Sequence, residues 1–327
     1  MLTSPLRFAL LDHVEAPHER PSSQVYDEVA SYVRLADRLG FDYYWFSEHH
    51  SHVHYGHLPW PLLLALHLAS QTQRIQLGTA IICLNLHHPL AIAEQTVVAD
   101  LLMHGRLAPG FGSGSSPTES TLFGHPIPSE QERHEHFSEA LGEILTNWRD
   151  TKSLPKAHPT LHSRSWQAVN SVGSAQIAGQ LGMNMMYSHL RTPEQYKLYR
   201  HTYLDSGGRG LIAANRPVYV GTDDITAITE AEPALRVLWR RFRSEGKIPA
   251  ETPEPDDPWA LCGHPINFLV GGPARVAAQI VALRAETDFD VINLEPSWAA
   301  LSPEHICASI ERLATQVRPA LMPPGTI

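Results

Sequence analysis

Short apolar runs alternate with longer segments of helical spacing along most of the chain. The apolar runs predict strands at residues 8–12, 43–47, 75–82, 106–112, 168–171, 183–188, 217–222 and 291–295. The segments with helical spacing are residues 25–39, 59–72, 89–103, 131–148, 174–181, 192–206, 225–245, 273–286 and 306–317. Continuous apolar strands are typical of a parallel sheet that helices cover on its outer face.

About eight strand–helix units in 327 residues predict an α/β fold, a (β/α)8 TIM barrel with insertions in the loops at the C-terminal face. The alternative is an open, doubly wound sheet. No domain boundary stands out, so residues 1–327 are expected to form one domain. Two stretches rich in loop-forming residues, 114–129 and 249–265, interrupt the pattern and are candidates for a lid over the barrel mouth.

Composition and charge narrow the class of protein. The net charge is −9 and no basic tract is present, so nucleic acid and anionic membranes are poor partners. The start of the chain lacks a signal-peptide pattern, and no apolar stretch is long enough to cross a bilayer. Three scattered cysteines, Cys83, Cys262 and Cys307, form no disulfide framework, so a reducing, cytoplasmic location is expected.

The second predicted strand ends in Glu48-His49-His50. A carboxylate beside imidazoles at a barrel strand end can supply a general acid or base near neutral pH. The alternative for His50 is a structural hydrogen bond. His52, His54 and His57 follow, but the later strand ends lack the further His, Lys or Asp ligands that a metal would need, so no metal is expected.

The fifth predicted strand leads through Asn170-Ser171-Val-Gly173-Ser174 into a helix. Free N–H groups and the helix dipole make such a turn an anion site, to which Arg133 could add a positive charge. A plain helix cap is the alternative for the turn, and a surface charge is the alternative for Arg133. The small residues Gly78-Thr-Ala80-Ile81 leave space for a planar ring, although core packing explains them equally well.

Taken together, these residues resemble the bacterial luciferase-like flavin monooxygenases over nearly the whole chain. The segments that carry the resemblance are Gly40-Phe-Asp42, Trp45-Phe-Ser-Glu48-His49-His50, Arg74-Ile-Gln-Leu-Gly78-Thr79-Ala80, His87-His88-Pro89-Leu-Ala-Ile-Ala93-Glu94-Gln95, His104-Gly105-Arg106-Leu107, Gly112-Ser-Gly114, Phe123-Gly124, Arg133 and Gly271-Gly272-Pro273-Ala-Arg-Val276-Ala. Each segment is modestly specific, whereas their order and spacing together are highly specific.

The resemblance implies a TIM barrel that uses reduced FMN, delivered by a separate flavin reductase, and O2 to oxygenate a small apolar or aromatic substrate through a flavin C4a-hydroperoxide. It implies that His49 is catalytic, and that a non-proline cis peptide joins Ala80 and Ile81 beside the flavin ring. It also implies homodimers formed through helices near the second and third strands. The positions that match the family's cofactor-binding residues are Ala80, Ile81, Gly112, Ser113, Arg133, Asn170, Ser171, Ser174 and Ser188.

Three positions depart from the luciferases themselves. Gly112 replaces a reactive cysteine, Ser113 replaces a phosphate-binding arginine, and Asn170 replaces an acidic residue. These changes argue against light emission and predict loose FMN binding, but they leave monooxygenation open. Two alternatives remain: hydride transfer with the deazaflavin coenzyme F420 on the same barrel, and a flavin-binding barrel without catalysis.

Overall fold

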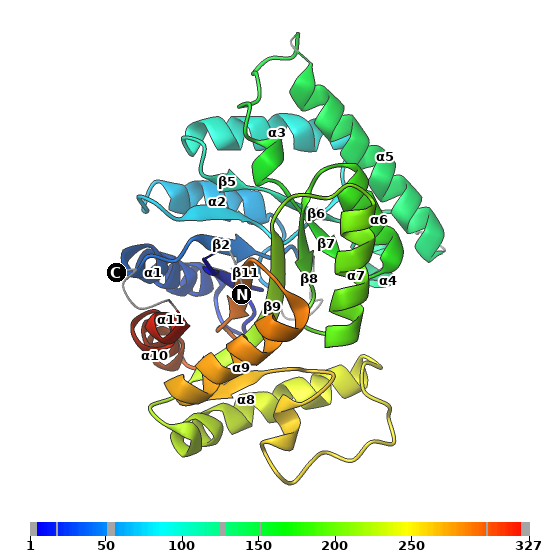
Figure 1. Ribbon diagram of the computed structural model, residues 1–327. Coiled ribbons are helices and arrows are strands. Elements are labelled where there is room, and N and C mark those ends of the chain that lie inside the picture. The colour runs from blue at the N-terminus through cyan, green and yellow to red at the C-terminus, as the bar shows by residue number, and fades with distance from the viewer. Residues whose placement is uncertain are drawn as a thin grey trace.

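A computed structural model describes residues 5–17, 19–50, 56–114, 116–124, 129–150, 152–298 and 300–321. Parallel strands lie at the centre and helices surround them (Figure 1). The strands are β1 (Arg7–Asp12), β2 (Tyr43–Phe46), β3 (Gln76–Thr79), β4 (Ile82–Cys83), β5 (Leu107–Ala108), β6 (Gly110–Gly112), β7 (Trp166–Val169), β8 (Asn184–Tyr187), β9 (Ile212–Val220), β10 (Leu269–Gly271) and β11 (Val291–Glu295).

The sheet closes on itself. Its order is β4-β6-β7-β8-β9-β11-β1-β2-β3-β5, with β10 paired to β9 outside this path. Only residues 80–81 separate β3 from β4, and only Pro109 separates β5 from β6. Because each pair is one interrupted strand, the two ends of the path meet and the ten segments form an eight-stranded barrel. The predicted TIM barrel is confirmed, and the open sheet is wrong.

The helices that follow the strands cover the barrel. Those described are α1 (Ser22–Leu39), α2 (Pro61–Ala69), α3 (Pro89–Leu102), α4 (Pro117–Leu122), α5 (Glu130–Arg149), α6 (Val172–Gln180), α7 (Pro193–Asp205), α8 (Asp224–Ser244), α9 (Pro273–Thr287), α10 (Pro303–Arg312) and α11 (Arg318–Leu321). In Figure 1, α2 and α3 lie above the strands, α5 to α7 to one side, and α8 and α9 below. Among the described residues, no helix is long and apolar enough to cross a membrane.

The structure differs from the predicted elements in three places. Strand β9 begins at Ile212, five residues before the expected start at 217, because Asn215, Arg216 and Pro217 obscured its apolar pattern. Strand β10 was missed because it has only three residues. The expected loop 114–129 contains the short helix α4, which Ser116 caps by accepting a hydrogen bond from the Glu119 N–H.

Two apolar layers hold the barrel together. A smaller cluster that includes Ala9, Leu11, Trp45, Trp166 and Met186 fills the barrel interior. The larger cluster joins the outer face of the strands to the helices. Within β1, residues 9 and 11 belong to the inner cluster whereas residues 8 and 10 belong to the outer one, as the twofold period of a strand requires. The next residue with the inward phase after Leu11 is His13, at the barrel mouth.

Backbone contacts explain two glycines near the mouth. A Cβ on Gly78 would lie 1.8 Å from the Ala108 carbonyl oxygen, and a Cβ on Gly110 would lie 2.2 Å from the Thr79 carbonyl oxygen. Both strands would have to separate to accept any side chain there. Of the two readings of Gly78, core packing is therefore the one that the structure supports.

Candidate functional site

Glu48 organises the end of β2 as a buried hydrogen-bond acceptor. His50 Nε2 and His87 Nε2 lie 2.7 and 2.8 Å from its Oε1, and the Cys83 N–H donates to its Oε2 at 3.2 Å. Burial alone would raise the pKa of Glu48, but the hydrogen bonds from the two imidazoles outweigh it and lower that pKa. Glu48 is thus an ionised structural centre. His50 is one of its partners, in agreement with the structural alternative for that histidine.

The ligand atoms of Glu48, His50 and His87 lie within 4.8 Å of one another. The two imidazoles both hydrogen-bond one carboxylate oxygen, which is a complete arrangement without an ion. His57, from the predicted His-rich loop, instead contacts Ser22 Oγ and the Ala16 carbonyl. His52 and His54 lie outside the described residues, so the expectation of no metal stays a prediction.

His49, the predicted catalytic residue, lies between two partners at the barrel mouth. Its Nε2 is 3.3 Å from His13 Nδ1, and its Nδ1 is 3.9 Å from Glu119 Oε1. The same Glu119 oxygen accepts the His50 N–H at 2.8 Å, so helix α4 is anchored to the end of β2. Burial would raise the pKa of Glu119, but its bonds to His49 and to the His50 N–H lower it.

A second backbone segment fixes His49 from behind. The His49 N–H donates to the Leu58 carbonyl at 3.1 Å. A Cβ on Gly56 would lie only 2.5 Å from the His49 Cβ, so the segment at Gly56 packs directly on this residue. Gly56 also forms an isolated bridge with Glu15, which follows β1.

A buried carboxylate lies on the far side of His13. Glu295, the last residue of β11, is 4% exposed, and its Oε2 lies 3.7 Å from His13 Nε2 and 3.3 Å from His189 Nδ1. Burial would raise the pKa of Glu295, but the two imidazoles hold it well below its ordinary value. Glu295 is therefore a buried anion at the same mouth as His49.

The sequence analysis did not single out His13, Glu119, His189 or Glu295. A signal for two of them was present, because the predicted strands 8–12 and 291–295 place residues 13 and 295 at the ends where barrel chemistry concentrates. Nothing in the local sequence marks Glu119 as a partner of His49, because that contact depends on how α4 folds back over β2.

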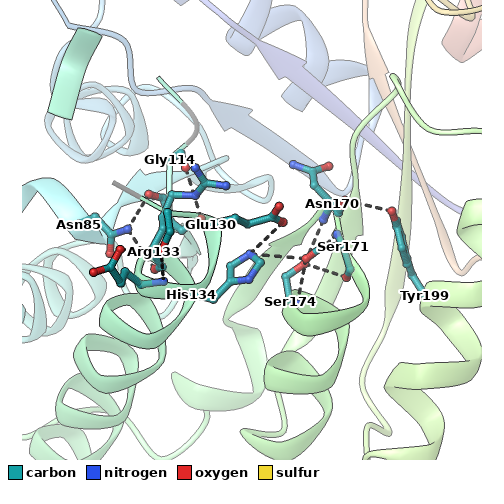
Figure 2. Close-up of polar contacts among 12 residues, drawn as sticks. Asn85, Gly114, Glu130, Arg133, His134, Asn170, Ser171, Ser174 and Tyr199 are labelled. Carbon is teal, nitrogen blue, oxygen red and sulfur yellow. Dashed lines mark hydrogen bonds and ion pairs between the residues drawn. The ribbon is translucent and has the colours of Figure 1, made fainter. Parts of the chain in front are cut away.

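The turn that was predicted to bind an anion, residues 170–174, forms a complete helix cap. Ser171 Oγ accepts the Ser174 N–H at 3.2 Å, while Ser174 Oγ accepts the N–H groups of Ser171 and Asn170 at 3.0 and 3.1 Å. Ser174 is thus engaged inside the turn. His134 of α5, which the sequence analysis missed, lies 3.5 Å from Ser171 Oγ (Figure 2). Burial, with a contribution from Arg133, lowers the pKa of His134.

Arg133 lies in the first turn of α5, close to the segment that follows β6. Asn85 Nδ2 donates to the carbonyls of Ser113 and Arg133 at 3.0 and 3.2 Å, which ties these segments together. Figure 2 shows the Arg133 and Asn170 side chains extending in the same direction, with the His134 ring below them. The Arg133 Nε is buried and has no hydrogen-bond partner among the described residues.

The donors present suit the phosphate of a flavin nucleotide. A guanidinium, the N–H groups in the first turn of α6, a hydroxyl and a carboxamide are groups that commonly bind phosphate. The unpartnered Arg133 Nε supplies a donor at this place. Gly173 keeps the approach narrow but open, because a Cβ there would lie 3.4 Å from His134 Nδ1.

The remaining predicted positions lie at the strand ends. The Ala80–Ile81 peptide is cis, as the resemblance implied, and the Ala80 carbonyl accepts a hydrogen bond from Ser47 Oγ at 2.9 Å. Gly112 faces Ile81, whose Cδ1 would lie 2.9 Å from a Cβ at that glycine. Ser188 follows β8 and accepts the Leu190 N–H at 3.3 Å.

Six aromatic residues of the sequence are candidates for lining a pocket for an apolar or aromatic substrate, and they are Phe8, Trp45, Tyr55, Trp60, Tyr187 and Trp298. Most of them belong to the core. Phe8, Tyr187 and Trp298 lie in the outer apolar cluster, and Trp45 stacks on Tyr43 inside the barrel, with ring centroids 4.7 Å apart. Trp60 is 39% exposed and lies 4.9 Å, between ring centroids, from His87. Tyr55, the sixth candidate, lies outside the described residues. Core packing thus explains most of these side chains.

Comparison with known proteins identifies the family of the chain. The family description "luciferase-like monooxygenase" matches residues 6–290. The oxygenase component of the flavin-dependent trigonelline monooxygenase of Acinetobacter baylyi is 25% identical, over 96% of this chain and 95% of its own. An uncharacterized protein of Sinorhizobium fredii, y4wF, is 31% identical over 196 residues, a match that spans just over half of either chain, 57%.

Solved structures share the fold. Monooxygenase RslO1 from Streptomyces bottropensis superposes with a TM-score of 0.83 at 24% identity, covering 97% of this chain and 100% of its own. The oxygenating constituent of 3,6-diketocamphane monooxygenase from Pseudomonas putida, in complex with FMN, gives a TM-score of 0.78 at 20% identity, covering 98% of this chain and 100% of its own. A coenzyme F420-dependent reductase from Methanopyrus kandleri gives 0.69 at 16% identity and coverage of 98% and 100%. With the barrel, its strand-end residues and the match over residues 6–290, this chain belongs to the luciferase-like monooxygenase family.

Proposed function

We propose that this protein is an FMN-dependent monooxygenase that takes reduced FMN from a separate flavin reductase and uses O2 to oxygenate a small apolar or aromatic substrate. One observation carries the proposal: the same barrel mouth holds a phosphate-type donor set around Arg133 and the Ser171 turn, and an acid–base group, His49. The flavin-dependent relative and the FMN complex of a similar barrel support a flavin as the cofactor.

The chain's own residues have separable roles in this proposal. Arg133, Asn170 and the first turn of α6 bind the phosphate, while Ser171 and Ser174 shape that turn through their mutual hydrogen bonds. The cis segment Ala80–Ile81, with Gly112 and Ser188, borders the ring. Bound reduced FMN supplies the electrons that activate oxygen.

His49 manages a proton at the reacting centre, and Glu119 fixes its Nδ1 side. Helix α4, which carries Glu119, helps to cover the mouth and to exclude water. The insertion at 249–265 is held to α8 through ion pairs of Glu254 with Arg236 at 2.9 Å and with Arg240 at 2.7 Å. Residue Asn267, just beyond it, donates to the His189 carbonyl at 2.7 Å.

F420-dependent hydride transfer is the second candidate, since the fold is shared with F420-dependent enzymes. Binding of reduced FMN and of F420 to the purified protein, measured anaerobically, separates the two. Reduced FMN should bind, and its oxidation under 18O2 with a panel of ketones, aldehydes and aromatics should place one labelled oxygen in a product. Tight binding of F420 without binding of reduced FMN would contradict the proposal, as would products that carry no label.

We propose that the protein forms a homodimer. The family resemblance supports this proposal, and so does one surface of the structure. Helices α2 and α3 expose large apolar side chains, which are Leu63 (64% exposed), Leu90, Val98, Leu101 and Leu102 (60% exposed). Apolar side chains gathered on two neighbouring helices are typical of a protein interface.

A further inference from the structure

Four side chains form a row across one side of the barrel mouth. They are Glu295 from the end of β11, His13 after β1, His49 after β2, and Glu119 from α4. The consecutive contacts are 3.7 Å from Glu295 Oε2 to His13 Nε2, 3.3 Å from His13 Nδ1 to His49 Nε2, and 3.9 Å from His49 Nδ1 to Glu119 Oε1. Two imidazoles therefore lie in series between two carboxylates.

The geometry favours a particular number of protons in this row. The outer nitrogens, His13 Nε2 and His49 Nδ1, lie 3.7 and 3.9 Å from carboxylate oxygens, and these negative charges favour a proton on each of them. A hydrogen bond between the two inner nitrogens requires one further proton between them. Two outer protons and one inner proton give three protons on four ring nitrogens, so the pair carries one positive charge.

We propose that His13 and Glu295 are positioning residues for His49: the two imidazoles share one excess proton, and the buried Glu295 carboxylate determines how tightly the pair holds it. The role assigned to the pair in catalysis rests on the proposed function. The shared proton itself is a property of this chain, whichever cofactor binds.

Burial and charge support this role for Glu295. Its carboxylate is almost fully buried, whereas the His13 side chain is 30% exposed, so water screens the field of Glu295 on the pair only in part. Burial would lower the pKa of His13, but Glu295, with help from Glu15, raises it. The charged or titratable groups around the pair are Asp12 and Glu15 beside His13, Arg241 of α8, His189 after β8, and Glu48, His50 and Glu119 near His49.

Arg241 and His189 moderate the effect. Arg241 forms an ion pair with Glu15 at 2.9 Å, which reduces the field of Glu15 on His13. His189 Nδ1 lies 3.3 Å from the same Glu295 oxygen that faces His13, so the two imidazoles compete for one carboxylate. Because of this competition, substitution of Glu295 and substitution of His189 should shift the titration midpoint of His13 in opposite directions.

The test is an NMR titration of the histidine Cε1–H signals of the complete protein, without flavin or substrate, with His13 assigned by its loss in His13→Asn. Glu295→Gln should lower the titration midpoint of His13 by about one pH unit or more, because it removes a negative charge and keeps the shape of the side chain. His189→Asn should raise the same midpoint, because it removes the competing imidazole. Glu311→Gln, an equal charge change at an exposed position of α10, should leave it unchanged.

An unchanged midpoint in a folded Glu295→Gln protein would overturn the proposal. If that variant does not fold, a His189→Asn midpoint that stays level or falls would do the same. A general loosening of the site cannot produce shifts of opposite sign. Since no cofactor is present in the titration, its outcome is independent of the FMN-binding experiment. In the working enzyme, the pH dependence of product formed per reduced FMN should shift in the same direction in each variant.

Discussion

The imidazoles of His13 and His49 meet at 3.3 Å, Nδ1 to Nε2, and so join the ends of β1 and β2 across the barrel mouth. This contact means that the predicted catalytic histidine works within a set of neighbours. His49 has one neighbour on each side. Its Nε2 faces His13, which in turn contacts Glu295, and its Nδ1 faces Glu119. The predictions below separate the binding of the cofactor, the proton chemistry and the assembly of the barrel.

His49→Ala should keep FMN affinity and lower oxygenated product by about 100-fold, which is the lower part of the range for loss of a positioned acid or base. Reduced FMN should still be oxidised, with hydrogen peroxide released instead of product. Product and peroxide per reduced FMN measure this directly. His201→Ala, at a solvent-exposed position of α7, is the matched control. Unchanged coupling in the His49 variant would remove this residue from the chemistry.

Gly56→Ala should impair the same step without replacing any reacting group. The added methyl would lie 2.5 Å from the His49 Cβ, so the imidazole must shift relative to His13 and Glu119. We expect coupling to fall as in the His49 variant, while the affinity for FMN stays within about twofold. Gly142→Ala, on α5 where a Cβ meets nothing within 4 Å, serves as the comparison. Full coupling in Gly56→Ala would show that the position of His49 is not critical.

Arg133→Gln should weaken the binding of FMN by about 10- to 100-fold, because a charge-assisted hydrogen bond contributes about 1.5–3 kcal/mol. Riboflavin, which lacks the phosphate, should bind the variant and the original protein equally. Titration calorimetry with both flavins measures the difference. Arg149→Gln, at the other end of the same helix, tests for general effects of charge. Equal weakening of both flavins would argue against a phosphate contact.

Leu102→Glu, combined with Leu63→Glu, should convert a dimer into monomers, since both side chains are exposed on α2 and α3 and a carboxylate there would be buried in the interface. Sedimentation velocity gives the mass in solution. Leu198→Glu introduces the same change on α7, also at an exposed position, and should not alter the mass. A monomeric original protein would refute the expected assembly at once.

Asp37→Asn should destabilise the fold by about 2 kcal/mol at pH 7, because the Asp37 carboxylate accepts the N–H groups of Gln73, Arg74 and Ile75 at 2.8 to 3.0 Å. Burial raises the pKa of Asp37, but these three bonds lower it below the ordinary value of 3.8. Its stabilising effect is therefore complete above about pH 4 and disappears as the pH falls through the lower, folded-state pKa.

Urea unfolding of Asp37→Asn and the original protein at pH 7 and at pH 3 tests this sign. The difference in unfolding free energy should be smaller at pH 3. Asp27→Asn, exposed on the same helix, should change stability little at either pH. A difference that grows toward low pH would contradict the assignment.

Prediction of the fold from the sequence succeeded where apolar segments were long. Helices α1, α3 and α5 begin and end within a few residues of the predicted positions. The spacing of their apolar residues indicates all three, and Gly40 also marks the end of α1 while Pro89 marks the start of α3. Strands that are short or carry polar residues were harder to predict from the sequence. Strand β9 carries Asn215 and Arg216, whose side chains are buried through contacts with Asn293 and Tyr196, and only the tertiary structure supplies those partners.

The site divides in the same way. Glu48, His49 and the Ser171 turn are contiguous sequence motifs, so local chemistry was enough to single them out. The partners of His49 are 36 and 70 residues away in the chain, at His13 and Glu119, and Glu295 is further still. No periodicity connects them.

By itself, the sequence determined the alternation of strands and helices, the family and the residues next to the strand ends, because these depend on local spacing and on motifs. The tertiary structure alone decided which strand ends are neighbours. Closing the sheet places β11 next to β1 and β1 next to β2, and this order sets two carboxylates and two histidines in one row. Contacts between residues far apart in the chain arise only when the barrel closes.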